Sequence, residues 1–237
     1  MSGAEGMSDL DRASALSDAG DHLAALALVD QILALEPGLV AAHVARGWAL
    51  ESLGPEHLVD AREAYAEAVR LDPDALWAKE GLANVLRRLG RPAEADTLAA
   101  EVVSQALALP ERDTEVLELQ GWCEYELDRL VDAEGTLRRA LDLDPDLVAV
   151  RFDLALVLLC AGRAEEAVEA YEDGLADARR LGGAAGLVRT ALQDLDAALA
   201  RRPEIRGQPV VNAVRRRLHA FDDPASSAGE ALPMGAP

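Results

Sequence analysis

The stretch RLDPDALWAKEGLANVLRRLGRPAEA, residues 70–95, holds the pattern that decides the fold. Its Leu-Asp-Pro-Asp turn at residues 71–74 returns 72 residues later at 143–146, and the Leu-Glu-Pro-Gly of residues 35–38 echoes it 36 residues earlier. Recurrence at such a distance is typical of chains built from stacked supersecondary units. The turn separates one unit from the next, because proline cannot continue a helix.

The composition predicts that these units are helical. Half of the 237 residues are hydrophobic but only 3% are aromatic, and alanine and leucine, both strong helix formers, supply most of the apolar content. Long alternating runs of β-branched residues, which would indicate strands, are absent. We therefore expect an all-α protein.

Three kinds of position, the prolines among them, share a period of about 34–38 residues. Each unit reads as a helix, a tight turn, a second helix and a proline turn. An alanine early in the second helix lets two backbones cross closely, and a turn residue before it allows a left-handed helix end. The turn residues are Gly20, Gly54, Gly90, Asp128 and Gly162, the alanines are Ala25, Ala61, Ala95, Ala133 and Ala167, and the prolines are Pro37, Pro73, Pro110 and Pro145.

With a further small residue in each first helix (Gly47, Ala83, Gly121 and Ala155), this pattern resembles the tetratricopeptide repeat. The resemblance implies a right-handed α-solenoid of helix-turn-helix repeats. It departs from the family pattern at residues 54–57 and 110–113, where residues are inserted, and at Arg179, where a proline is expected. Five repeats span residues 6–181, with the boundaries 6–39, 40–75, 76–109, 114–147 and 148–181.

The ends of the chain differ from the repeats. Residues 187–221 contain two amphipathic stripes, which predict C-terminal capping helices over the last apolar face. Residues 1–5 are expected to be flexible. The tail at 222–237, rich in Ser, Ala, Gly and Pro, is expected to be disordered.

The formal net charge of −20 argues against binding to nucleic acid or to an anionic membrane surface. No apolar run is long enough to span a bilayer, and no signal peptide is evident, so we expect a cytoplasmic protein. Arginine supplies every basic residue except Lys79, a bias that indicates a GC-rich, bacterial source. The segment 187–221 alone is basic, with seven arginines against three acids.

No catalytic constellation is recognisable. The four histidines form no HExxH pair, and Cys123 and Cys160 have no metal or redox spacing. Adjacent carboxylates such as Glu165 and Glu166 lie on predicted exposed helix faces, where no pKa shift suited to acid–base catalysis is expected. We therefore predict a non-enzymatic protein with no metal and no cofactor.

The resemblance also implies a binding surface, because the first helices of such repeats line a concave groove. All three tryptophans fall on groove positions, although the chain contains only eight aromatic residues. Tryptophan is enriched at binding hot spots. The expected groove residues are Val44, Trp48, Glu51, Trp77, Glu80, Asn84, Arg87, Arg88, Glu115, Glu118, Trp122, Tyr125, Glu126, Phe152 and Leu156.

These residues predict an apolar, Trp-lined groove rimmed with acids. The expected function is a scaffold or adaptor that binds a basic, amphipathic or extended segment of a partner protein or peptide. Packing of the tryptophans between neighbouring first helices is the competing interpretation. One alternative function is a self-associating module, in which the basic cap of one chain meets the acidic repeats of another. A non-catalytic subunit of an enzyme complex is a further alternative.

Overall fold

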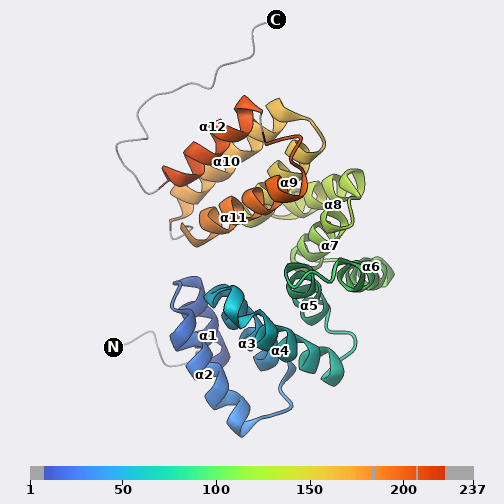
Figure 1. Ribbon diagram of the computed structural model, residues 1–237, viewed down its shortest axis with the longest axis vertical. Coiled ribbons are helices and arrows are strands. Elements are labelled where there is room, and N and C mark those ends of the chain that lie inside the picture. Colours follow the sequence, from blue (N-terminus) through green and yellow to red (C-terminus); the bar gives the residue numbers. More distant parts are fainter. Residues whose placement is uncertain (1–7, 183–184, 207, 222–237) are drawn as a thin grey trace, which may run out of the picture. The chain divides into compact units, whose positions relative to one another are not determined.

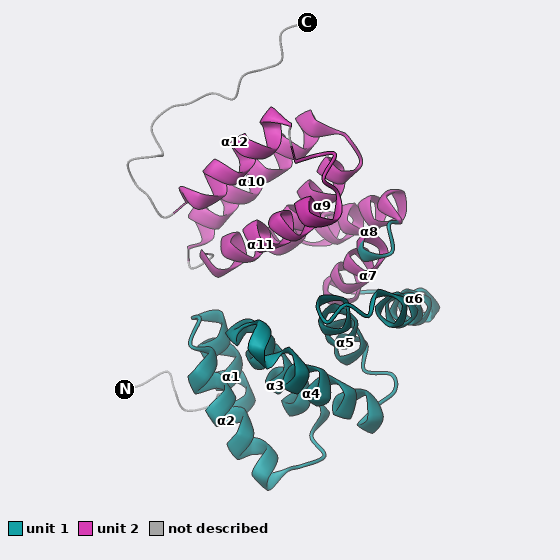
Figure 2. Cartoon of the chain, in the orientation of Figure 1, with its two compact units in different colours: residues 1–112, 126–128 teal, residues 113–125, 129–237 magenta. Residues whose placement is uncertain are grey.

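The computed structural model describes residues 8–182, 185–206 and 208–221, and the regular structure within these ranges is entirely helical (Figure 1). The expected flexible start at residues 1–5 and the expected disordered tail at 222–237 lie outside the described residues. The chain divides into two compact units (Figure 2). Unit 1 comprises residues 1–112 and 126–128, and unit 2 comprises residues 113–125 and 129–237.

Unit 1 is built from three helix pairs in which successive helices pack against each other. Ser8 begins the first helix with a capping box, in which its side chain and that of Asp11 each accept the other residue's backbone N–H. The helices are α1 (Asp9–Asp18), α2 (His22–Leu35), α3 (Val40–Leu53), α4 (Leu58–Leu71), α5 (Leu76–Arg88) and α6 (Pro92–Ala108), with the short 3-10 helix η1 (Pro55–His57) before α4.

Unit 2 contains the remaining pairs, and one large apolar core runs through them. Its first four helices lie between residues 114 and 181, and two further helices lie between residues 185 and 219. In Figure 1, α11 lies beside α9, and both helices of this last pair contact α10. The helices are α7 (Thr114–Glu126), α8 (Leu130–Leu143), α9 (Val148–Cys160), α10 (Ala164–Leu181), α11 (Ala185–Arg201) and α12 (Pro209–His219).

The turn between the two helices of each repeat has the left-handed conformation that the sequence pattern predicts. Gly90 has a φ of 76° and Asp128, the non-glycine member of the series, has a φ of 61°. Aspartate tolerates this region better than most residues, because its short side chain can bond locally. The periodic turn signal and the all-α repeat fold are thus confirmed.

The first aspartate of each Leu-Asp-Pro-Asp turn makes a hydrogen bond within the turn. The side chain of Asp72 accepts a hydrogen bond from the backbone N–H of Asp74 at 2.9 Å. The second copy repeats this contact between Asp144 and Asp146 at 2.9 Å. The motif is therefore an Asx turn that shapes the connection itself.

Within a repeat, a small residue on the first helix makes room for a large one on the second. A Cβ atom at Gly47 on α3 would lie 2.8 Å from the ring of Tyr65 on α4. The same relation holds between Gly121 on α7 and Leu137 on α8, at 2.6 Å. The volumes of the paired positions are therefore complementary, as dense core packing requires.

This complementarity makes alanine substitution at two helical glycines opposite in effect. Gly47→Ala is expected to destabilise the protein, because overpacking costs about 1–3 kcal/mol and exceeds the gain in helix propensity of about 1 kcal/mol. Gly135→Ala on α8, where no atom lies within 4 Å of the added methyl, is expected to stabilise by about 0.5–1 kcal/mol. Urea denaturation monitored by circular dichroism measures both, and equal effects would contradict the packing argument.

Candidate functional site

Two aromatic side chains stand exposed on the first helices of neighbouring repeats in unit 1. Trp48 on α3 is 53% exposed and Trp77 on α5 is 44% exposed. Helical spacing puts Val44 and Glu51 on the face of α3 that carries Trp48. On α5 the same spacing groups Glu80, Asn84 and Arg88 with Trp77. We call this surface of unit 1 the α3–α5 face.

Hydrogen bonds to one carboxylate hold the two helices of this face in register. Oε1 of Glu51 accepts from Nδ2 of Asn84 at 2.7 Å and from Nη1 of Arg88 at 2.9 Å. Both α3 and α5 begin a repeat, so they run in the same direction. Glu51 lies opposite Asn84. Trp48 and Glu80 each lie about one helical turn before these residues, so they are also opposite each other.

The carboxylate of Glu51 also bonds to a core residue on the second helix of its own repeat. The hydroxyl of Tyr65 on α4 donates to Oε2 of Glu51 at 3.3 Å. Burial raises the pKa of Glu51, and the charge and hydrogen bond of Arg88 oppose that rise. Tyr65 therefore connects the repeat core to the α3–α5 face.

The face is less acidic than the sequence led us to expect. Arg88 forms an ion pair with Glu51 at 2.9 Å, and Arg87 pairs with Asp96 at 3.0 Å and also with Glu126. The expected groove residues Glu51 and Glu126 therefore have arginine partners. The face therefore presents two exposed indole rings beside charges of both signs.

In unit 2, α7 carries a second set of expected groove residues. Glu115 is exposed, while Glu118 and Trp122 are partly buried. Burial, followed by repulsion from Glu115, raises the pKa of Glu118. The ring of Trp122 packs against that of Tyr125, with centroids 5.1 Å apart. The amino-terminal half of α7 thus carries the two carboxylates, and its carboxyl-terminal half carries the partly buried Trp122 packed on the buried Tyr125.

Three residues expected in the groove are core residues in the structure. Tyr125 and Leu156 are each 2% exposed, and Phe152 is 3% exposed. They share one core with residues of α11, which packs on α9. Placing them on an open surface was therefore incorrect: the Phe152 ring packs against Tyr171 and Gly174 of α10, and all three residues belong to the core that includes α11. The uninterrupted apolar run from Leu154 to Leu159 was the available signal, since a helix face open to solvent is seldom so uniformly apolar.

Other kinds of site find little support in the structure. Among the described side chains, no three His, Cys, Asp or Glu residues are placed to hold a metal ion. None of the helices in the described ranges combines the length and the apolar character needed to cross a membrane.

Paired antiparallel helices with a small-to-large crossing position define a helical-repeat protein. The sequence profile described as tetratricopeptide repeat matches residues 57–96, 97–148 and 132–182, together more than half of the chain. The chain belongs to the tetratricopeptide repeat family, whose members generally form protein- and peptide-binding scaffolds.

Solved structures agree with this fold. TTC0263, a tetratricopeptide repeat protein of Thermus thermophilus, is 24% identical with a TM-score of 0.62, over 78% of this chain and 97% of that one. PilW, a type IV pilus biogenesis factor, is 20% identical with a TM-score of 0.55, over 87% of this chain and 96% of that one. A comparison with curated proteins finds no match.

Proposed function

We propose that this protein is a non-catalytic scaffold that binds a segment of a partner protein on the α3–α5 face. The observation that carries the proposal is the exposure of Trp48 and Trp77, about half of each side chain, on adjacent first helices. Exposed tryptophans on a rigid framework are typical of binding hot spots, where a partner buries them. The helices beneath them are held in register, so little ordering is needed on binding.

The partner segment that suits this face is apolar with basic flanks. Apolar anchors would cover the tryptophans, while arginine or lysine would approach Glu80 and the face of an indole ring. The net charge of −20 favours encounter with basic partners over long distances. Self-association through the basic cap is less favoured, because Arg215 pairs with Asp196 at 2.9 Å and Arg217 pairs with Glu172 inside unit 2.

Affinity capture with matched variants tests the proposal. Trp48→Ala and Trp77→Ala are each expected to weaken partner binding about tenfold or more, since a hot-spot tryptophan contributes about 2 kcal/mol. Leu35→Ala is the control, because Leu35 is also apolar, belongs to unit 1 and is 84% exposed. Partners are captured from lysate, identified by mass spectrometry and titrated by calorimetry.

Circular dichroism verifies that each variant is folded. Loss of binding in both tryptophan variants with full binding by Leu35→Ala supports the proposal. Undiminished binding by a folded Trp48→Ala/Trp77→Ala double variant would rule out the α3–α5 face.

A further inference from the structure

Equivalent positions on the first helices of two repeats differ in exposure to solvent between unit 1 and unit 2. The ninth residue of the second expected repeat is Trp48, which is 53% exposed, whereas the ninth residue of the fifth repeat is Leu156, which is 2% exposed. Leu156 belongs to a core that includes residues of α11, and α11 packs on α9. In unit 2, the surface where a partner segment would bind is therefore occupied by a helix of the same chain.

An arginine at the end of α11 extends this contact to the neighbouring first helix. Nη2 of Arg201 donates to the hydroxyl of Tyr125 on α7 at 2.9 Å. The guanidinium carbon also lies 5.2 Å from the centre of the Tyr125 ring. A cation on an aromatic face, with a hydrogen bond at its edge, is the kind of contact a basic partner would make.

α11 as a whole has the features of such a basic, amphipathic partner segment. Val188, Leu195 and Leu199 face the core, whereas Arg189 is exposed. α11 is thus an amphipathic helix with an arginine at its carboxyl end. The residues of its apolar stripe are separated by seven and by four residues, as on one face of a helix. This is the helix-in-groove mode of recognition, realised within one chain.

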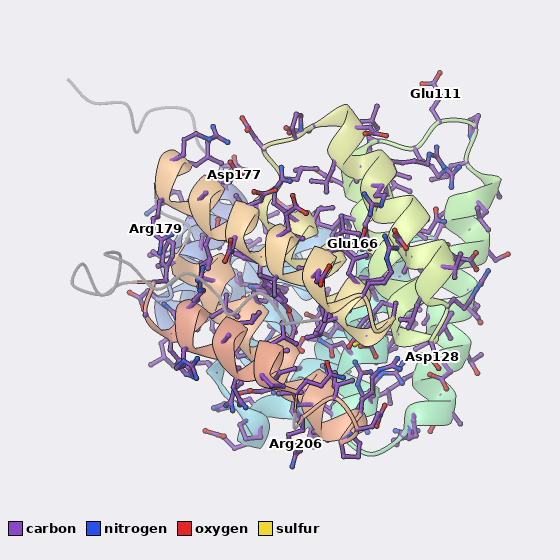
Figure 3. The ribbon with its side chains drawn as sticks, turned by 90° about the horizontal axis from the view of Figure 1, so that it is seen from above. Glu111, Asp128, Glu166, Asp177, Arg179 and Arg206 are labelled. Atoms are coloured by element: carbon purple, nitrogen blue, oxygen red, sulfur yellow. The ribbon has the colours of Figure 1, made fainter. Side chains whose placement is uncertain are left out.

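The last helix pair, α11 and α12, follows a boundary in the sequence at the end of α10. The family match ends at residue 182, and Gly182 ends α10 with a φ of 70°. Polar contacts that hold the pair include Arg217 with Glu172 and the Arg179 guanidinium 5.2 Å from the centre of the Phe221 ring. Figure 3 labels Arg179 near the carboxyl end of α10. Ion pairs at such exposed positions are individually weak.

We propose that α11 is an intramolecular ligand of unit 2, which reversibly occupies the surface of α7 and α9 around Tyr125 and Leu156, called here the α7–α9 surface. The partner that fits this surface is another amphipathic helix with an arginine near its carboxyl end, and it binds by displacing α11. The inference rests on contacts inside unit 2, and it stands whether or not the α3–α5 face binds a partner.

Cleaving the folded full-length chain between α10 and α11 tests the proposal. A protease recognition sequence replaces residues 183–184, and the protein is cut after folding. The fragment that begins at residue 185 is expected to stay bound, to dissociate at a measurable rate while unit 2 remains folded, and to be exchanged by a synthetic peptide of residues 185–221. Size-exclusion chromatography with a labelled fragment measures this rate.

Two arginine variants on α11 supply a matched pair. Arg201→Gln is expected to speed dissociation about tenfold, equivalent to about 1.4 kcal/mol. Arg189→Gln is expected to leave the rate unchanged, because Arg189 is exposed. Equal rates for the two variants would overturn the role of the Tyr125 contact.

Hydrogen exchange on the uncut wild-type chain provides a second measurement that does not depend on any variant. Amides of α11 and α12 are expected to exchange faster than those of α9 and α10, because the last pair opens by itself. Equal exchange in all four helices would mean that α11 opens only when α9 and α10 unfold. That result would show that α11 is a permanent part of the core. Immediate loss of the cut fragment without rebinding would equally contradict the proposal.

Discussion

Tyr65→Ala is expected to lower the free energy of unfolding by about 3–5 kcal/mol, the range typical of removing a large aromatic side chain from a core. The ring is 2% exposed, and it fills space that glycines leave on two helices. A Cβ atom at Gly47 on α3, or at Gly81 on α5, would overlap it. The cavity left by alanine would therefore open at the point where three helices meet.

The same variant is expected to disturb the α3–α5 face, because the Tyr65 hydroxyl supports Glu51. Tyr65→Phe separates the two effects. It retains the ring and removes one hydrogen bond of about 1 kcal/mol. Urea denaturation measures stability for both variants. A loss below about 1 kcal/mol for Tyr65→Ala would mean that the glycines do not define a tightly packed site.

Glu124→Leu is expected to cost about 2–3 kcal/mol, because it leaves buried polar partners unsatisfied. Glu124 on α7 is 2% exposed. One of its carboxylate oxygens accepts from Nε2 of Gln120 at 2.6 Å, and the other accepts from the hydroxyl of Thr136 on α8 at 2.7 Å. This network pairs the two helices of one repeat through polar contacts within an otherwise apolar interface.

A double variant tests whether unsatisfied polar groups cause the loss. In Glu124→Leu/Thr136→Val the hydroxyl that lost its acceptor is also removed, so part of the stability is expected to return. The coupling is obtained from a double-mutant cycle with Thr136→Val alone. Strictly additive effects of the two substitutions would show that the carboxylate and the hydroxyl stabilise α7 and α8 independently.

Periodic features of this chain could be predicted because they depend on local chemistry. Turn residues such as Gly90 need a left-handed conformation, and proline turns end helices wherever they occur. A small residue such as Gly47 is required wherever a ring such as that of Tyr65 crosses it. Each requirement concerns residues within one repeat, so it recurs with the repeat and is visible without any structure.

The exposed and buried positions of the candidate binding surface could be predicted only in part. Trp48 and Trp77 were expected on a first-helix face, and the structure exposes both. Phe152 and Leu156 had the same expected placement but are buried, because Phe152 packs on α10 and both belong to a core shared with α11. Likewise, the contact of Arg201 with Tyr125 could not be predicted, since nothing in the neighbouring sequence indicates a partner 76 residues away.

By itself the sequence determined the helices, the turns between them, the repeat length and the family. These follow from conformational preferences and from spacings within about forty residues, which each repeat restates. Only the tertiary structure decided which equivalent positions are open, which carboxylates have arginine partners and where the last helix pair packs. Those properties depend on contacts between helices distant in the chain, and an amphipathic stripe shows that a helix will be covered without specifying by what.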